Sequence, residues 1–232
     1  MGKRIIQQRR GRGTSTYRVS KRAFRYRVKY PKKLEGEGEV LKLFNSAAHT
    51  SPLAKIKCKE GIFYMPAFKG MIEGQKIKFQ GKEIKEGNIL RLKDIPVKTL
   101  IYNIESKPGD GGKFIRGGGN YAQVSRVIGG EIFIWLPSKK EKKFNPNCRA
   151  TIGRVAGGGR TDKPIVKAGK KYYIKKTKSK LWPRTSAVKM NAIDHPFGSG
   201  RAKNPKSKIA KRNAPPGRKV GLLRPKRTGK RK

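Results

Sequence analysis

The acidic residues of this chain are confined almost entirely to its middle, and this distribution constrains the fold more than any other feature. Residues 1–34 hold 13 Lys and Arg and no acid, and residues 171–232 hold 21 with a single acid. Residues 35–97 hold 11 basic and eight acidic residues, and residues 98–170 hold 15 and five. Segments as charged as the two ends cannot offset their ordering entropy by burying apolar surface. We therefore expect a folded middle between two basic arms that are disordered in isolation.

The net charge predicts the partner of the chain. Its 232 residues include 60 Lys and Arg against 14 Asp and Glu, which gives a formal charge of +46. Self-repulsion at this density disfavours a compact state unless a polyanion compensates for it. The partner is therefore expected to be nucleic acid, and a free basic protein that compacts DNA or RNA is the alternative that composition alone allows.

Short apolar or alternating runs divided by Gly, Pro and Asn fill the middle of the chain and are typical of β-strands. Two sets of five such runs predict two small closed β-barrels, one in residues 35–97 and one in 98–170. Little helix is expected, at most a turn or two near residues 166–171. The predicted strands are Glu39–Phe44, Ala54–Cys58, Ile62–Met65, Lys76–Phe79 and Ile89–Leu92, then Thr99–Ile104, Ala122–Ile128, Glu131–Leu136, Lys142–Phe144 and Ala150–Val155.

Metal, cofactor and membrane roles find no support in the sequence. Cys58 and Cys148 lack a second Cys or a His at the spacing of a zinc half-site, so both are expected to be small buried apolar residues. No run of 18 apolar residues occurs, and no apolar segment follows the basic start as in an export signal. We expect no metal, no cofactor and no membrane contact.

Two glycine-rich stretches are candidate sites of close approach to nucleic acid. The first, PGDGGKFIRGGG at Pro108–Gly119, is not a Walker loop, which would need Gly at position 107 and Ser or Thr at position 114. Its glycines and its Lys113 and Arg116 favour contact with a phosphate, and a flexible interstrand loop is the alternative. The second, Val155–Arg160, has Arg154 and Arg160 at its edges and is either a similar contact or a linker.

Aromatic residues lie between the cations of the first arm. Phe24 and Tyr26 are the clearest examples. Their rings are suited either to stacking on bases or to packing on the protein's own barrel, and the sequence favours neither role.

His195 lies in the segment MNAIDHPFGSG, Met190–Gly200. Catalysis by His195 with Asp194 is disfavoured, because adjacent side chains rarely converge on one target and no nucleophile is implied. The nearby Pro and Gly residues instead predict a rigid turn in which Asn191, Asp194 and His195 hydrogen-bond to nucleic acid, with a purely structural turn as the alternative. No residue is predicted to be catalytic, and the chain is not expected to be an enzyme.

Four motifs in a fixed order resemble one known family. KPGDGGKFIRGGGNYAQV (Lys107–Val124), CRATIGRV (Cys148–Val155), MNAIDHPFGSG (Met190–Gly200) and SKIAKRNAPPGRKVG (Ser207–Gly221) are similar to the L-two family of large-subunit ribosomal proteins. The Phe at 197, where the bacterial form has a second His, and the NAPPGRKVG segment resemble the archaeal and eukaryotic branch. One departure is Ser199, where the family usually has Gly, and another is SAVKMN at residues 186–191.

The resemblance implies an all-β chain with an oligonucleotide-binding-type (OB) barrel followed by an SH3-like barrel. It implies a cytoplasmic protein of the ribosome that binds 23S-type rRNA, contacts neighbouring ribosomal proteins and helps the small subunit to associate. It also implies that the extension carrying His195 approaches the peptidyl-transferase region, where RNA carries the chemistry. The family motifs, the two glycine-rich stretches and the basic C-terminal extension together give the predicted RNA-binding residues. These are Lys113, Arg116, Arg149, Arg154, Arg160, Asn191, Asp194, His195, Gly198, Arg201, Arg212 and Arg218.

Overall fold

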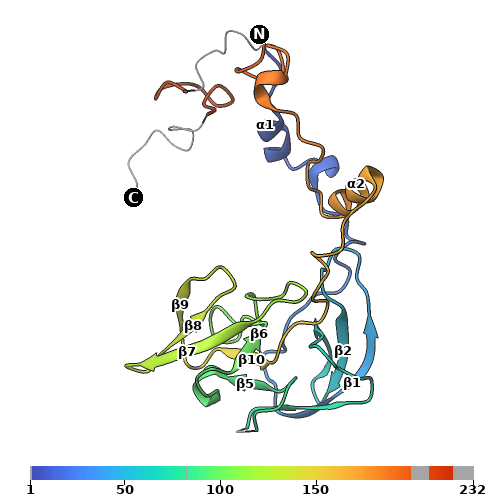
Figure 1. Cartoon of the computed structure of the whole chain (residues 1–232), viewed down its shortest axis with the longest axis vertical. Helices are drawn as coiled ribbons and strands as arrows, with labels where there is room; N and C mark the ends of the chain where they lie inside the picture. Colours follow the sequence, from blue (N-terminus) through green and yellow to red (C-terminus); the bar gives the residue numbers. More distant parts are fainter. Residues whose placement is uncertain (1, 82, 200–208, 222–232) are drawn as a thin grey trace. The chain divides into compact units, whose positions relative to one another are not determined.

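The structure is a computed structural model that describes residues 2–81, 83–199 and 209–221 (Figure 1). The chain divides into two compact units, one formed by residues 1–20 with 168–232 and the other by residues 21–167. The second unit, here called the β unit, contains all the strands of the described residues, and the first, here called the terminal unit, contains the α-helices.

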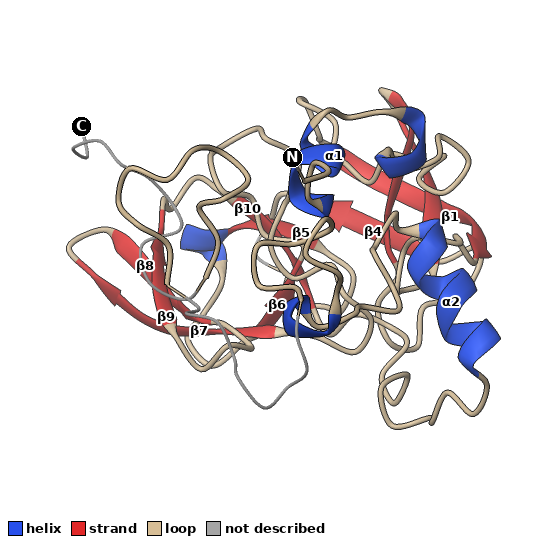
Figure 2. Cartoon of the chain, turned by 90° about the horizontal axis from the view of Figure 1, so that it is seen from above, coloured by secondary structure: helices blue, strands red, loops and turns tan. Residues whose placement is uncertain are grey.

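The β unit is built on one sheet whose strand order is β3-β2-β1-β4-β5-β10-β6-β7-β8-β9. Figure 2 shows the strands in red. Neighbouring strands are antiparallel except for β4 and β5, which pair in parallel through Phe79 and Ile89. The all-β prediction is confirmed, and each predicted strand has a counterpart. The strands are β1 (Gly36–Phe44), β2 (Leu53–Cys58), β3 (Gly61–Pro66), β4 (Lys76–Phe79), β5 (Ile89–Arg91), β6 (Leu100–Tyr102), β7 (Ala122–Ile128), β8 (Glu131–Trp135), β9 (Glu141–Phe144) and β10 (Arg149–Ile152).

Two hydrophobic cores lie in the β unit, and each is built mainly from one predicted set of strands. The two sets are hydrogen-bonded to each other, because β10 of the second set pairs with β5 of the first as well as with β6 of its own. Ile89 belongs to the first core and its neighbour Leu90 to the second, as expected when successive side chains of a strand point to opposite faces. Strand β10 is buried along its whole length. The two cores are therefore joined through a common middle strand.

The segment before β1 packs on the strands. Ala23, Val28, Tyr30 and Leu34 are buried, and Val28 forms a parallel bridge with Tyr64 of β3. The sequence places this segment in a basic arm that ends at residue 34, and that boundary stays a prediction. In the structure the apolar residues that alternate with its cations belong to the β unit.

Helix is more extensive than the sequence predicts. Helix α2 spans Ala168–Thr177, longer than the one or two turns expected near residues 166–171, and α1 (Ile6–Gly11) was not expected. Neither helix has a buried residue, so neither has the apolar stripe by which a helix is recognised in sequence.

The cysteines differ in their surroundings. Cys148 is fully buried, and burial raises the pKa of its thiol to about 11. Cys58, the last residue of β2, is only half-buried, so the expectation of two buried cysteines is wrong for this residue. Across residues 2–81, 83–199 and 209–221, no three His, Cys, Asp or Glu side chains gather as they would around a metal ion. The helices described here are too short or too polar to cross a bilayer.

Candidate nucleic-acid interface

An open groove of about 790 Å³ in the β unit brings cations and aromatic rings together. It joins the segment before β1, the loop after β1 and the glycine-rich loop between β6 and β7. The residues with functional side chains in its lining include Phe24, Tyr26, Lys29, His49, Lys113 and Arg116. Lys113 and Arg116 are predicted RNA-binding residues, and the structure places them in the same groove.

The carboxylate of Asp110 organises the glycine-rich loop. Its Oδ2 accepts the backbone N–H groups of Ser106 at 3.0 Å and Lys107 at 3.2 Å, and its Oδ1 accepts that of Gly112 at 3.1 Å. Burial alone would raise the pKa of Asp110, but these hydrogen bonds and Lys113 hold it below its ordinary value. Lys113 Nζ lies 3.3 Å from the carboxylate, and the Lys113 side chain is exposed. The loop is thus ordered from within and presents Lys113 to solvent.

Arg116 is held in the wall of the groove. Its Nε donates to Oδ1 of Asn103 at 2.9 Å, and one terminal nitrogen donates to the carbonyl of Gly111 at 3.4 Å. Partial burial lowers the pKa of Arg116, yet a guanidinium remains charged at any physiological pH. The groove therefore contains a fixed positive charge with further N–H donors available for an anion.

The two aromatic residues of the first arm are placed differently. Tyr26 packs on the protein itself, with its ring 4.5 Å from that of Phe44 and 4.9 Å from that of Tyr64. Phe24 contacts His49 edge-on at 5.0 Å and leaves 46% of its surface exposed. Proteins that bind single-stranded nucleic acids combine aromatic rings, on which bases stack, with cations that neutralise phosphates. An exposed ring beside cations matches this combination. Lys29 and His49 are not among the predicted site residues, and for Phe24 the sequence leaves base stacking open as one of two alternatives.

Arg149 lies inside the β unit. Its Nε and one terminal nitrogen donate to Oε1 of Glu105 at 3.2 and 2.7 Å, and the other terminal nitrogen donates to the carbonyl of Pro31 at 2.9 Å. The Glu105 side chain is fully buried. The backbone N–H groups of Gly109, Gly111 and Arg149 also donate to its carboxylate. This gives Arg149 an internal partner, and its predicted contact with RNA stays a prediction.

Arg154 and Arg160 face solvent at the two edges of the second glycine cluster. The guanidinium of Arg154 lies over the ring of Tyr121, 4.8 Å from its centroid. The two glycine clusters pack against each other: a Cβ added to Gly119 would lie 2.7 Å from Cα of Gly158. Their glycines therefore serve close packing within the protein, which sequence patterns do not distinguish from close approach to a ligand.

In the terminal unit, the predicted turn around His195 is present. The carbonyl of Asn191 accepts the backbone N–H groups of Asp194 at 3.0 Å and His195 at 3.3 Å, and the N–H of Gly198 donates to the carbonyl of His195 at 2.8 Å. A Cβ added to Gly198 would lie 2.3 Å from the carbonyl oxygen of Asn191, so this position requires glycine. Asn191, Asp194, His195 and Gly198 are thus parts of one small folded element.

The imidazole of His195 has defined roles for its two nitrogens. The backbone N–H of Phe197 donates to Nδ1 at 3.1 Å, so Nδ1 is unprotonated and the proton of the neutral ring is on Nε2. Burial lowers the pKa of His195 below its ordinary value of 6.5, which favours this neutral form at pH 7. No hydrogen-bond partner for Nε2 is found within the described part of the chain. His195 therefore presents one N–H donor.

The start of the chain contacts this turn. The N–H of Lys3 donates to the carbonyl of Ile193 at 2.8 Å, and Lys3 Nζ lies 3.9 Å from the carboxylate of Asp194. At the other end of the motif, Ser199 has a φ of +81°, in the region that favours glycine. The family that the chain resembles usually has Gly at this position, and the positive φ accounts for that preference.

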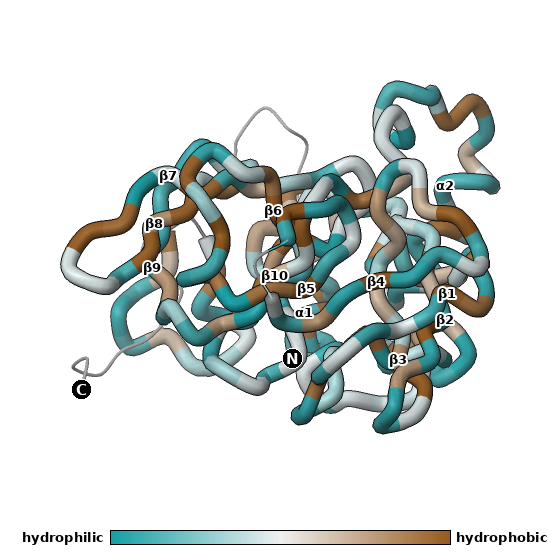
Figure 3. Tube along the Cα trace, turned by 90° about the horizontal axis from the view of Figure 1, so that it is seen from below, coloured by the Kyte–Doolittle hydropathy of each residue, from teal (hydrophilic) through white to brown (hydrophobic). Residues whose placement is uncertain are grey.

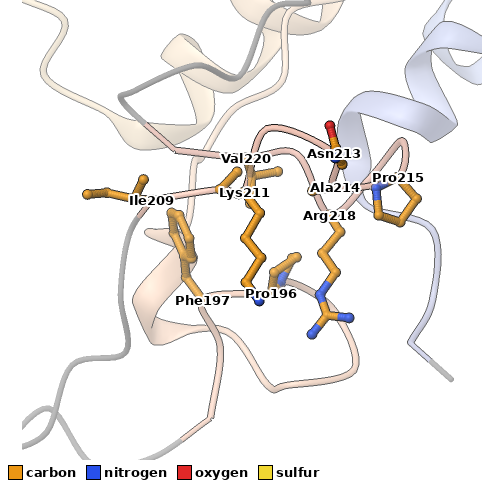
Figure 4. Close-up of a pocket in the computed structure, with 10 residues that line it drawn as sticks. Pro196, Phe197, Ile209, Lys211, Asn213, Ala214, Pro215, Arg218 and Val220 are labelled. Atoms are coloured by element: carbon orange, nitrogen blue, oxygen red, sulfur yellow. The ribbon is translucent and has the colours of Figure 1, made fainter. Parts of the chain in front are cut away.

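A pocket of the terminal unit, about 480 Å³, is lined by Pro196 and Phe197 together with the segment that follows residue 208 (Figure 4). Lys211 and Arg218 also line it, and Figure 4 draws both side chains. Both are exposed, as is Arg212. Arg201 lies outside the described residues. The predicted cations Arg212 and Arg218 thus belong to the same unit as the His195 turn.

Comparison with known proteins identifies the family. Residues 85–217 match the family described as Ribosomal Proteins L2, C-terminal domain. Three archaeal proteins named Large ribosomal subunit protein uL2 align with the whole chain and over their own full length. Those of Archaeoglobus fulgidus and Methanothrix thermoacetophila are 46% identical, over 238 and 237 residues, and that of Methanothermobacter thermautotrophicus is 43% identical over 243. The chain therefore belongs to the ribosomal protein L2 (uL2) family, in its archaeal form, as its four motifs predict.

Proposed function

We propose that the chain is a structural constituent of the large ribosomal subunit that binds large-subunit rRNA and has no catalytic activity of its own. Its three relatives are named as large-subunit ribosomal proteins, and each aligns with this chain over its full length. Neighbouring ribosomal proteins are its other expected partners, and the assembled ribosome in the cytoplasm is its place of action.

The observation that carries this proposal is the ordered basic groove of the β unit. Fourteen acidic residues cannot neutralise 60 cations, so most of the positive charge requires an external polyanion. Within the groove, hydrogen bonds to the protein hold Arg116, and Lys113 is exposed at the rim of an ordered loop. A preorganised arrangement of charges and rings favours one folded RNA over any duplex.

A finer proposal concerns the terminal unit. The His195 turn combines a neutral imidazole donor, a glycine at a close backbone contact and cations on the adjoining segment. We infer that it supports the architecture of the peptidyl-transferase region and the association of the two subunits by contacts with RNA. Proton transfer plays no part in this role.

A competition assay distinguishes the proposal from a free nucleic-acid-compacting protein. The full chain is bound to labelled large-subunit rRNA at about 150 mM salt and challenged with excess bulk duplex DNA. Retention on the rRNA is expected, because the groove discriminates a folded single-stranded region from a duplex. Displacement in proportion to total phosphate would contradict the ribosomal role and favour the compacting protein.

A further inference from the structure

A second aromatic face lies on the β unit outside the groove. Tyr121 immediately precedes β7, Gln123 is two residues further on the same side, and Trp135 of β8 pairs with Gln123 across the sheet. Ala122, Val124 and Ile134 point the other way and are buried in the second core. Tyr121 is 42% exposed and Trp135 is 55% exposed. These two rings are therefore not needed for the fold of the strands that carry them.

The two rings border a shallow pocket of about 320 Å³. It is lined by residues 119–123 and 135–137. The amide Nε2 of Gln123 donates to the carbonyl of Lys98 at 3.0 Å, which fixes this side chain beside Trp135. The volume is at the low end of the range for small-ligand sites, about 300 to 1,000 Å³, and suits one planar group.

Paired backbone segments hold Tyr121 next to Arg154. The N–H of Val155 donates to the carbonyl of Asn120 at 3.1 Å, so the residues on either side of this hydrogen bond are brought together. As a result, the Arg154 guanidinium lies over the Tyr121 ring. The N–H of Gly119 donates back to the carbonyl of Val155 at 3.1 Å. The cation and the ring are thus fixed before any ligand binds.

We propose that this face, formed by Tyr121, Gln123 and Trp135 with Arg154 at its edge, binds one unpaired RNA base, which stacks on Trp135. The inference rests on the proposed function, in which the chain binds rRNA. Exposed aromatic rings and Arg planes are the surfaces on which bases of single-stranded RNA stack. Gln123 and Arg154 supply polar groups at the rim for the base edge and the phosphate. The large positive charge of the chain favours RNA over a protein segment as the occupant.

Fluorescence of Trp135 tests the stacking contact. The chain has two tryptophans, so Trp182→Phe leaves Trp135 as the only one. Binding of a short oligoadenylate to this full-length variant should quench the emission of Trp135 and protect it from acrylamide. Inorganic polyphosphate, an equally anionic ligand without bases, should do neither. Equal effects of the two polyanions would overturn the proposal.

Affinity measurements give a second, independent test. Trp135→Ala should weaken binding of oligoadenylate by about 5- to 150-fold, the effect of losing one stacked base, and Trp135→Phe should retain most of the affinity. The matched control is Val127→Ala, because Val127 is an apolar residue of β7 that is 54% exposed and lies outside the proposed site. Figure 3 shows that apolar residues of the β7–β8 hairpin continue up to the turn between the two strands. Val127→Ala should bind as the parent does.

The outcomes also separate this site from the proposed function. If the parent chain prefers rRNA to DNA while Trp135→Ala binds RNA as tightly as the parent, the base site is wrong and the ribosomal role stands. If Trp135 becomes covered by a neighbouring ribosomal protein in the absence of RNA, the face is a protein interface and the proposal fails. Loss of the preference for rRNA in the parent chain would instead contradict the proposed function itself.

Discussion

Arg149 shows how a motif residue can serve the interior of a nucleic-acid-binding protein. Its guanidinium and the buried carboxylate of Glu105 form an ion pair with several charge-assisted hydrogen bonds. The same guanidinium donates to the carbonyl of Pro31 and so ties the segment before β1 to β10. Since Glu105 is out of contact with water, its charge depends on these partners.

Arg149→Ala is therefore expected to destabilise the β unit by about 3 to 5 kcal/mol, because it leaves the Glu105 carboxylate buried and unpaired. The measurement is urea unfolding of the full chain, followed by near-UV circular dichroism. Arg126→Ala is the matched control, because the Arg126–Glu141 pair has the same 2.7 Å separation on an exposed face and is expected to be worth at most about 1 kcal/mol. Equal losses for the two variants would contradict a structural role for Arg149.

The pH dependence of the His195 turn follows from the direction of its pKa shift. In the unfolded chain His195 has the ordinary pKa of 6.5, and burial lowers its pKa in the folded turn below that value. At a pH between the folded and the unfolded pKa, the unfolded chain therefore binds more protons than the folded turn. The turn should therefore lose stability as the pH falls through 6.5, and protonation of Nδ1 removes the hydrogen bond from the Phe197 N–H. Titration of the His195 ring resonances by NMR should give a pKa under 6.5. A value above 6.5 would show that the neutral ring is not the favoured form.

Replacement of His195 tests whether it acts by position. Gln supplies an N–H donor where Ala supplies none, so reconstituted large subunits should show a graded loss, larger for His195→Ala than for His195→Gln. Assembly and subunit joining should fail as much as peptide transfer does. Normal assembly and joining by His195→Ala particles, with single-turnover peptide transfer reduced by about 10² to 10⁴, would identify a general base instead.

Among the elements, the two glycine clusters are the most informative, because they form one contact. Gly118 lies against both the loop after β1 and the second cluster: its N–H donates to Oγ1 of Thr50 at 3.2 Å, and an added Cβ would lie 2.5 Å from the Thr50 carbonyl oxygen and 3.1 Å from that of Gly157. At Gly158 an added Cβ would meet only Cα of Gly119, at 3.7 Å. Space for a side chain thus differs sharply between two glycines of the same contact.

Gly118→Ala is expected to lower the free energy of unfolding by about 1 to 3 kcal/mol, because backbone must move to admit the methyl group. Gly158→Ala is expected to change it by less than about 0.5 kcal/mol. Neither glycine has a positive φ, so the comparison isolates steric contact from backbone strain. Thermal unfolding of both full-length variants provides the measurement, and similar midpoints would mean that the clusters are not packed together in solution.

The elements also show what sequence can and cannot predict here. Strands such as β7 and β8 were predicted closely, because alternation of apolar residues is a local signal. The position of β10 between β5 and β6 was not predicted, since strand order depends on contacts far apart in the chain.

In the candidate site, too, local patterns could be predicted and contacts between distant parts of the chain could not. Lys113 and Arg116 were found from a local pattern, whereas Phe24 and His49 join them only through folding. The role of glycine was ambiguous in sequence because close packing and ligand contact both require the absence of a side chain.

At the scale of the whole molecule, the β unit should survive as a folded fragment of the free chain. The buried residues Ala23, Val28, Tyr30 and Leu34 protect the segment before β1, so limited trypsin digestion should leave a fragment that starts near residue 21 and ends near residue 167. Mass spectrometry of the resistant fragment gives both ends. Rapid cleavage after Lys29, Lys32 or Lys33 would show that this segment belongs to the basic arm, as its composition alone predicts.

The most direct test of RNA binding at these sites is a UV cross-linking map of the chain in assembled large subunits. Cross-links to large-subunit rRNA are expected from peptides that contain Phe24, Lys113 with Arg116, and the His195 turn, the places where the structure combines donors or rings with cations. Cross-links confined to other parts of the chain, with the groove peptides absent, would contradict an interface built on the groove.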